Sequence, residues 1–277
     1  EDESYAIFLS DLHVGSRYFL GEDFNRFLRW INQDLGSEAQ RQTASKVKYV
    51  FIIGDLVDGC GVYPDQEKEL TIKDIKDQYN ECASLLSGIP KHLKLIICPG
   101  NHDAMRVAEP QFPIYRDFAE SLYSLPNTIM VSNPAWVNIH SSKNFSGFDV
   151  MLYHGYSFDY YVAEVESIRA NGGYDRADLI MKFLLQKRHL APAHTSTLYT
   201  PDSKSDPLFI NKIPDFFVSG HIHKAAASNY RNITLISGSC WQSKTAYQEK
   251  VGHHPEPSRV PIVNLQTRQV KMLKFGK

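Results

Sequence analysis

The chain has 277 residues, 43% hydrophobic and 12% aromatic, and 30 Lys and Arg against 31 Asp and Glu leave a formal net charge of −1. This composition excludes intrinsic disorder, and the near-neutral charge argues against a broad basic surface for duplex DNA. No apolar run approaches the roughly 20 residues that a membrane span needs, so we expect no membrane partner.

Strand-like and helical patterns alternate through the first half of the chain. Continuous apolar runs predict strands at 5–9, 48–53 and 93–98, and apolar residues at helical spacing predict helices near 24–35, 72–86 and 112–124. This alternation implies right-handed crossovers and a sheet that is covered on both faces.

The second half is richer in strands. Apolar runs predict strands at 148–153, 215–219, 233–237, 261–265 and 270–275, with helices at 160–170 and 176–189. The Pro-, Asp- and Ser-rich stretches 60–69 and 191–207 are expected to be surface loops, and 61–69 is either a lid or a subunit contact. We expect one α/β domain over 1–277, built on two packed sheets.

The cysteines are the next feature, because there are four and they form no Cys-x-x-Cys pair. This spacing argues against a zinc ribbon or a thioredoxin-like site, and disulfides would be sparse for this length. We therefore expect unpaired thiols and an intracellular, cytoplasmic protein. Because the chain opens on Glu1 and a strand-like run follows at once, we also expect the natural protein to have a further region before this residue.

Chemically distinctive residues follow five of the predicted strands. The stretches are Ser10-Asp11-Leu12-His13, Gly54-Asp55-Leu56-Val57-Asp58-Gly59, Gly100-Asn101-His102-Asp103, His154-Gly155 and Gly220-His221-Ile222-His223. Each alone is weak: an Asp-x-His pair is common in solvated loops, and a lone His is usually a hydrogen-bonded loop residue. Together they are informative, since sites form at the carboxyl ends of strands in open α/β sheets. We expect these turns to converge on one rim.

The donor types indicate the ligand. Carboxylate, amide oxygen and imidazole without thiolate suit Mn²⁺, Fe or Zn²⁺ rather than Ca²⁺ or a structural zinc ion. There are too many donors for one tetrahedral ion. Two ions about 3.5–4 Å apart need a bridging carboxylate, and such a pair holds both oxygens of an in-line phosphoryl displacement. Asp55 is the natural bridge, because it is short and lies between two glycine-flanked turns.

In this order, the five stretches resemble the calcineurin-like metallophosphoesterase superfamily. That likeness implies two packed mixed β-sheets flanked by helices, a four-layer αββα sandwich. More narrowly, the segments Asp58-Gly59-Cys60-Gly61-Val62-Tyr63-Pro64, Lys187-Arg188-His189-Leu190-Ala191-Pro192 and Val260-Pro261-Ile262-Val263-Asn264-Leu265 resemble the small subunits of archaeal family D DNA polymerases. The chain would correspond to their C-terminal phosphoesterase domain, without the oligonucleotide-binding domain that precedes it.

The resemblance also implies roles for individual residues. One metal ion would be held by Asp11, His13, Asp55 and His223, and the other by Asp55, Asn101, His154 and His221. Mn²⁺ is the ion we expect first. His102 would be the catalytic residue: it would lie beside the scissile phosphate and protonate the leaving 3′-oxygen. Asp58 and Asp103 would support these residues rather than bind metal themselves.

The function that follows is a 3′→5′ DNA exonuclease that proofreads for a replicative polymerase. The expected partners are the large catalytic polymerase subunit, in a heterodimer or larger assembly, and a single-stranded or frayed DNA 3′ end. Two alternatives stay open: another binuclear phosphoesterase, such as a protein phosphatase or cyclic-nucleotide phosphodiesterase, and a catalytically silent polymerase scaffold. No expected ligand is missing, which disfavours the scaffold.

Contacts to DNA are the least defined part of this hypothesis. Arg17, Tyr156 and Arg188 are the candidate substrate-binding residues. In the aromatic run Tyr156, Phe158, Tyr160 and Tyr161, one or two rings could stack on a terminal base, or the run could pack in the core as a helix begins.

Overall fold

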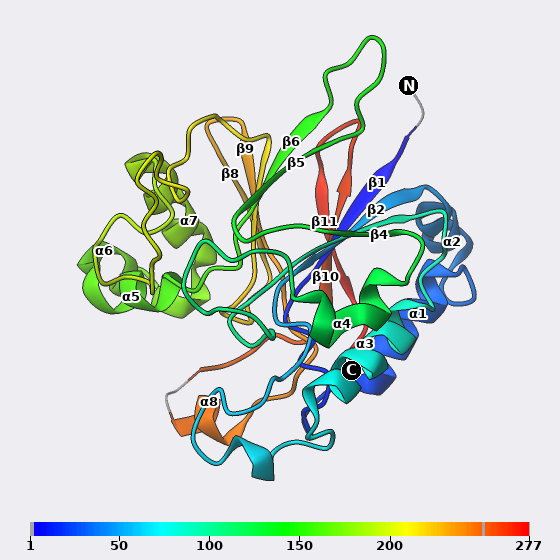
Figure 1. Cartoon of the computed structure of the whole chain (residues 1–277). Coiled ribbons are helices and arrows are strands. Elements are labelled where there is room, and N and C mark those ends of the chain that lie inside the picture. Colours follow the sequence, from blue (N-terminus) through cyan, green and yellow to red (C-terminus); the bar gives the residue numbers. More distant parts are fainter. Residues whose placement is uncertain (1–2, 251–252, 277) are drawn as a thin grey trace.

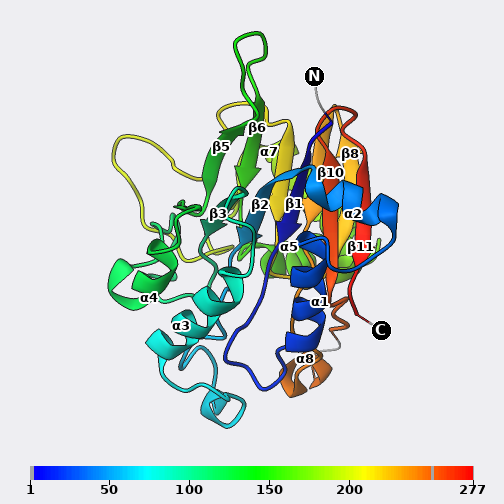
Figure 2. The ribbon, with the colours of Figure 1, turned by 90° about the vertical axis from the view of Figure 1, so that its right-hand side faces the viewer.

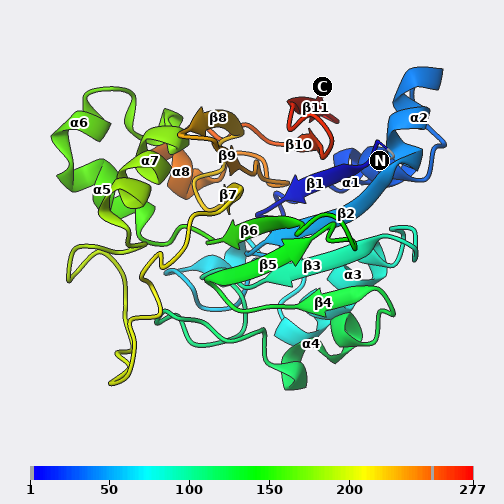
Figure 3. The ribbon, with the colours of Figure 1, turned by 90° about the horizontal axis from the view of Figure 1, so that it is seen from above.

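The computed structural model describes residues 3–250 and 253–276. Two sheets pack face to face, with helices α1–α4 on one outer side and α5–α7 on the other (Figure 1). A view from above shows the same layers end on (Figure 3). The expected α/β sandwich of two mixed sheets between helices is confirmed.

The first sheet has the strand order β11-β10-β1-β2-β3-β4. Neighbours among β1–β4 run parallel, whereas β10 and β11 add antiparallel strands at one edge. The bounds are β1 Tyr5–Leu9, β2 Val47–Ile53, β3 Lys94–Cys98, β4 Thr128–Met130, β10 Arg259–Asn264 and β11 Val270–Lys274.

The second sheet has the order β5-β6-β7-β9-β8. Its three central strands are parallel, and the two edge strands are antiparallel to their neighbours. The bounds are β5 Ala135–Ile139, β6 Phe148–Leu152, β7 Phe216–Ser219, β8 Ala226–Tyr230 and β9 Ile233–Ser237.

The helices cover the outer faces. In Figure 2 the helix-covered face of the first sheet is turned toward the viewer, and α1, α3 and α4 lie in front of it. The bounds are α1 Gly21–Ile31, α2 Glu38–Ser45, α3 Ile75–Leu86, α4 Arg116–Tyr123, α5 Phe158–Glu164, α6 Glu166–Arg169, α7 Ala177–Lys187 and α8 Ala246–Lys250, with short 3₁₀ turns at Gln66–Lys68 and Gly173–Asp175. Within the described residues, no helix combines the length and the apolar character that a membrane crossing requires.

Alternating side chains of the central strands enter two different cores. Along β1, Ile7 packs toward α1 and α3, whereas Phe8 packs between the sheets and stacks on Phe51 with ring centroids 5.0 Å apart. Phe216 reaches the same inter-sheet core from the second sheet. Because both faces of these strands are buried, their sequences are continuous apolar runs. The β-α-β prediction rested on such runs.

Two local predictions need correction. The helix expected at 160–170 is broken at Val165, whose φ of −99° and ψ of 102° are extended, so α5 and α6 are separate. The stretch 60–69 is more than a surface loop, because Gln66 is fully buried and hydrogen-bonds Asp58. As expected, the four cysteines are unpaired; three of them are buried, and Cys60 is exposed.

Candidate metal centre

The backbone has an unusual conformation at the residues that the sequence predicts as metal donors. The predicted donors follow the carboxyl ends of β1, β2, β3, β6 and β7, which gather at one rim of the two sheets. Five of the donor residues have left-handed φ values between 50° and 71°, namely Asp11, His13, Asp55, His221 and His223. Such conformations are costly for residues with a Cβ, and surrounding structure must hold them in place.

Glycines allow these loops to approach one another closely. A Cβ at Gly100 would lie 2.2 Å from Asp55 Oδ1, and one at Gly220 would lie 2.6 Å from Asp11 Oδ2. Both distances are far inside van der Waals contact. Only glycine therefore lets the carboxylates take their observed positions.

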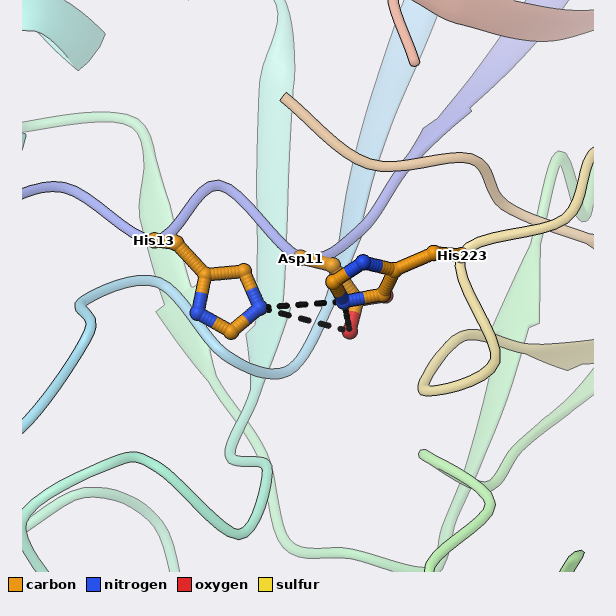
Figure 4. A group of neighbouring side chains, drawn as sticks. All are labelled: Asp11, His13 and His223. Atoms are coloured by element: carbon orange, nitrogen blue, oxygen red, sulfur yellow. Dashed lines mark hydrogen bonds and ion pairs between the residues drawn. The ribbon is translucent and has the colours of Figure 1, made fainter. Parts of the chain in front are cut away.

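One group of donors consists of Asp11, His13 and His223 (Figure 4). The Nε2 atoms of the two histidines face each other at 3.1 Å, and Asp11 Oδ1 lies 3.4 Å from His223 Nε2 and 4.0 Å from His13 Nε2. All three side chains are buried. Two imidazole nitrogens and a carboxylate that converge in this way match the donors of a divalent cation.

A second group consists of Asp55, His154 and His221. His154 Nε2 lies 3.3 Å from Asp55 Oδ2 and 3.1 Å from Asn101 Oδ1. The other ring nitrogen, Nδ1, lies 2.8 Å from the carbonyl oxygen of Ile53, to which only a protonated Nδ1 can donate. This contact leaves Nε2 as the nitrogen available to a cation.

Asp55 lies between the two groups. Its Oδ2 is 3.9 Å from His13 Nε2 as well as 3.3 Å from His154 Nε2. Burial acts to raise the pKa of Asp55, but the neighbouring His154 and His102 hold it well below its usual range. An ionised carboxylate in contact with both groups is the arrangement that a bridged pair of cations needs.

Negative charge is concentrated around His154, which lies close to the carboxylates of Asp55 and Asp11. Burial acts to lower the pKa of His154, but Asp55 and Asp11 raise it to about 10. Carboxylates that hold a proton this firmly on imidazole also favour a cation, which displaces the proton when it binds. The donor set therefore fits divalent metal ions.

Polar residues around the donors fix their orientation. The Asp58 carboxylate lies 3.1 Å from His13 Nδ1 and accepts hydrogen bonds at 2.9 Å from Gln66 Nε2 and Gln242 Nε2. The Asp103 carboxylate accepts from the Gly100 N–H at 2.8 Å and from the Tyr79 hydroxyl at 3.0 Å. Burial and the charge of Asp55 raise the pKa of Asp103 to about 7.

His102 is held by backbone groups rather than by these carboxylates. Its Nδ1 lies 2.7 Å from the carbonyl oxygen of Asp58, and its ring stands edge-on to His13 with centroids 4.7 Å apart. The His102 ring thus contacts the backbone of Asp58 and not its carboxylate; burial lowers the pKa of His102, and the charges of Asp55 and Asp58 act against that shift. The Tyr63 ring lies 6.5 Å from His102, so segment 61–69 borders the site.

Sequence reasoning missed Asp159. His221 Nε2 donates to Asp159 Oδ2 at 2.8 Å, which leaves Nδ1 of His221 for the second group. Asp159 lies in the first turn of α5, only five residues after His154. This short separation from His154 is the signal by which the sequence could have indicated Asp159. The sequence holds no comparable signal for Gln66 and Gln242, which bind Asp58.

The candidate substrate residues are not all at this rim. The Tyr156 ring lies 5.8 Å from the His221 ring, and Tyr156 is partly exposed. Arg17 is exposed beside Tyr18. Arg188 binds the carbonyl oxygen of Ile210 in a separate pocket that no donor lines. The structure thus brings Tyr156, but not Arg188, to the donors.

The four aromatic side chains that follow His154 differ in burial. Phe158 and Tyr161 are buried in the core beneath α5 and α7. Tyr156 and Tyr160 are partly exposed. Core packing is therefore confirmed for Phe158 and Tyr161, whereas stacking of Tyr156 or Tyr160 on a terminal base stays a prediction.

Two mixed sheets between helix layers, with Asp, Asn and His at the carboxyl ends of five strands, define a calcineurin-like metallophosphoesterase fold. Within that class, the chain belongs to the B-subunit family of DNA polymerases alpha and epsilon, whose model matches residues 6–227.

Individual relatives agree with this family. The chain is 41% identical over 269 residues to the DNA polymerase II small subunit of Methanothermobacter thermautotrophicus, covering 97% of this chain and 53% of that protein. It is 39% identical over 277 residues to the same subunit of Pyrococcus furiosus, covering 100% and 44%. The chain thus spans about half the length of these relatives.

Solved structures show more distant likeness. A novel archaeal phosphodiesterase aligns with a TM-score of 0.47 at 12% identity, covering 97% of this chain and 98% of that one. Vps29 of Entamoeba histolytica, complexed with zinc, aligns with a TM-score of 0.41 at 14% identity, covering 98% and 99%.

Proposed function

We propose that this chain is the phosphoesterase part of a replicative DNA polymerase small subunit, and that it removes nucleotides from DNA 3′ ends as a proofreading exonuclease. The supporting observation is that a chain of this polymerase-subunit family has Asp and His side chains that could hold metal ions clustered with His102 at one rim. A subunit retained only for assembly has no need of these buried, strained donors.

Two divalent cations fit the donors described. Asp11, His13, Asp55 and His223 would hold one, and Asp55, Asn101, His154 and His221 would hold the other. Mn²⁺ is the ion we propose, and Fe or Zn²⁺ would meet the same donors. When bound, the pair supplies positive charge to the phosphate and lowers the pKa of a water molecule.

The residues of the chain then have separate tasks. Water attacks the phosphorus atom, and the bond between phosphorus and the 3′-oxygen of the penultimate nucleotide breaks. The attacking water loses one proton to solvent, the doubly protonated His102 gives its Nε2 proton to that 3′-oxygen, and the terminal residue leaves as a 5′-mononucleotide. Asp58 holds His13, and Asp159 holds His221, so that neither ring rotates away from the other residues that would hold the metal ions.

We further propose that the chain acts in the cytoplasm with a large catalytic polymerase subunit. The relatives carry the name of a small subunit, and the net charge of −1 offers little general attraction to DNA. A partner that grips the duplex would deliver the unpaired 3′ end to this rim. Vigorous, processive digestion of duplex DNA by this chain alone would contradict that dependence.

The test compares three substrates with one protein. Purified chain is incubated with a 5′-labelled single-stranded oligonucleotide, a phosphopeptide and a cyclic nucleotide, each with Mn²⁺ and with chelator. We expect a ladder of progressively shorter labelled products from the oligonucleotide only, and none with chelator. Hydrolysis of the phosphopeptide or cyclic nucleotide alone would assign another phosphoesterase activity, and no hydrolysis would leave the scaffold role.

A further inference from the structure

Two hollows open beside the metal centre, and Tyr156 lines both. The His102 hollow, of about 430 Å³, is bordered by Asn101, His102, Val62, Val107, Phe118 and Tyr156. The Tyr160 hollow, of about 830 Å³, is bordered by Tyr156, Asp159, Tyr160, Leu198, Tyr199 and Pro201. Tyr156 therefore stands where the two meet.

Apolar or aromatic side chains line most of the His102 hollow and half of the Tyr160 hollow, which is also lined by Asp159 and by the polar stretch 194–197. In the His102 hollow, Val107 and Phe118 each expose 37% of their surface, and in the Tyr160 hollow Leu198 exposes 56%. Among the described residues that line either hollow there is no Lys or Arg. Such walls do not attract phosphate, but they suit the flat, uncharged face of a nucleobase.

Each hollow is joined to the metal centre through a different residue. The first includes His102 and Asn101 directly. The second reaches the centre through Asp159, whose carboxylate binds His221 Nε2 at 2.8 Å. A phosphate at the centre thus has room for one organic group on either side. A phosphodiester has two such groups, whereas a phosphomonoester has one.

We propose that the two hollows are nucleoside subsites of fixed polarity: the His102 hollow takes the penultimate base, and the Tyr160 hollow takes the terminal base that is released. This inference rests on the proposed function, because the polarity comes from His102. The phosphorus–O3′ bond breaks, water oxygen stays on phosphorus, and the His102 proton goes to O3′. The nucleoside that carries O3′ must then lie on the His102 side.

Small esters separate the two subsites. Bis(p-nitrophenyl) phosphate contains neither nucleoside, thymidine 5′-(p-nitrophenyl phosphate) contains only the terminal one, and a single-stranded oligonucleotide contains both. The ratio of kcat/KM for the thymidine ester to that for the bis ester reports on the terminal subsite. The ratio for the oligonucleotide to that for the thymidine ester reports on the penultimate subsite.

Four variants at partly exposed positions test the polarity. Tyr160→Ala is expected to lower the first ratio about tenfold, the loss that one stacking contact accounts for, and Leu198→Ala is expected to lower it by a smaller factor, because an aliphatic side chain does not stack. Phe118→Ala and Val107→Ala are expected to lower the second ratio, again with the larger loss for the aromatic residue. Met272→Ala, in the edge strand β11 and 37% exposed, is the matched control and should change neither ratio.

The outcomes are distinct. Three results would overturn the subsite assignment: the two pairs of variants exchange their effects, each variant lowers both ratios equally, or no variant changes either ratio. If the wild type still degrades the oligonucleotide, the exonuclease function stands in all three cases. If the wild type cleaves the bis ester but neither nucleotide substrate, the exonuclease function itself fails. Circular dichroism of each variant excludes misfolding as the cause of a loss.

Discussion

The main-chain N–H of His102 donates a hydrogen bond to Asp55 Oδ1 at 2.8 Å. The residue that we propose as the proton donor and the carboxylate that we propose as the metal bridge are therefore joined through the backbone, across neighbouring strands β2 and β3. Changes to either side chain should nevertheless have different effects, because only one of the two is a bridging donor.

Asp55→Asn keeps an oxygen that can accept the His102 N–H but removes the negative charge. Both cation sites then lose their shared ligand. We expect the manganese content after dialysis to fall from about two ions per chain to well below one. Elemental analysis measures this, with far-UV circular dichroism as the check on folding. Retention of both ions would contradict the bridging role.

His102→Gln removes the proposed acid and leaves every metal ligand in place. Hydrolysis of the oligonucleotide should fall by roughly 10²- to 10⁴-fold, the usual contribution of a general acid. The manganese content should stay close to that of the wild type. If this variant loses as much metal as Asp55→Asn, His102 is a ligand and not the acid.

Asp159→Asn weakens the hold on His221, whose Nε2 donates to this carboxylate. Removing a group that orients a metal ligand costs about 10- to 100-fold in metal affinity. We expect a loss in this range, measured by titrating the metal-free protein with Mn²⁺. Glu164→Gln, an exposed carboxylate of the same helix, is the control. Equal affinities for both variants would exclude the orienting role.

The buried carboxyl of Glu109 makes stability depend on pH. It accepts a hydrogen bond from the Tyr153 hydroxyl at 3.0 Å. Burial raises its pKa to about 7, against the smaller opposing effects of Thr197, Tyr153, His154 and His221. Between about pH 4.5 and 7 the folded protein then binds more protons than the unfolded chain, so this group makes stability fall as pH rises.

In Glu109→Gln the amide cannot ionise, so this variant does not lose stability through residue 109 as the pH rises. We compare the free energies of unfolding of the variant and the wild type, measured in urea under the same metal conditions. Between pH 5 and pH 8 the difference should shift in favour of the variant by roughly 1–3 kcal/mol. The difference should be constant above pH 8. A gap between the two proteins that does not change with pH would show that Glu109 is ionised throughout.

Phe51→Ala tests the core between the sheets. The Phe51 side chain is fully buried and stacks on Phe8. Its removal should lower the free energy of unfolding by about 3–5 kcal/mol, since a cavity replaces it. Phe112→Ala, at 57% exposure, should cost far less in the same urea experiment. Similar losses for both variants would show that the sheets repack around the gap.

The elements that the sequence predicted are those with a continuous apolar run or a full helical stripe. The edge strands β5 and β8 have neither: β5 is buried only at its two ends, and β8 alternates between partial and full exposure. Helix α2 has little apolar surface, but its capping box is visible in the sequence as Ser37 and Gln40. The sequence thus contains a start signal for this helix, although its apolar periodicity does not predict it.

The candidate site also contains residues that the sequence predicted and residues that it did not. Its donors were predicted because chemically distinctive residues directly follow apolar strands, and strand ends converge in this kind of fold. Gln242 was not predicted, because its contact with Asp58 joins residues 184 positions apart and follows no local pattern. The contacts of Asp58 with His13 and of Asp103 with the Gly100 N–H could not be predicted for a related reason: the sequence places both residues near His102 but does not give the direction of their side chains.

The turn at residues 140–147 joins β5 to β6 and projects from the upper end of the molecule (Figure 1). Strand β6 begins next to this turn and leads to His154 at the other end, about 17 Å away for five extended residues. An exposed tip so distant from the chemistry tolerates insertions. A biotin acceptor peptide placed there would anchor the protein to glass with the candidate metal centre facing solution, so that the proposed trimming of DNA ends could be tested one molecule at a time.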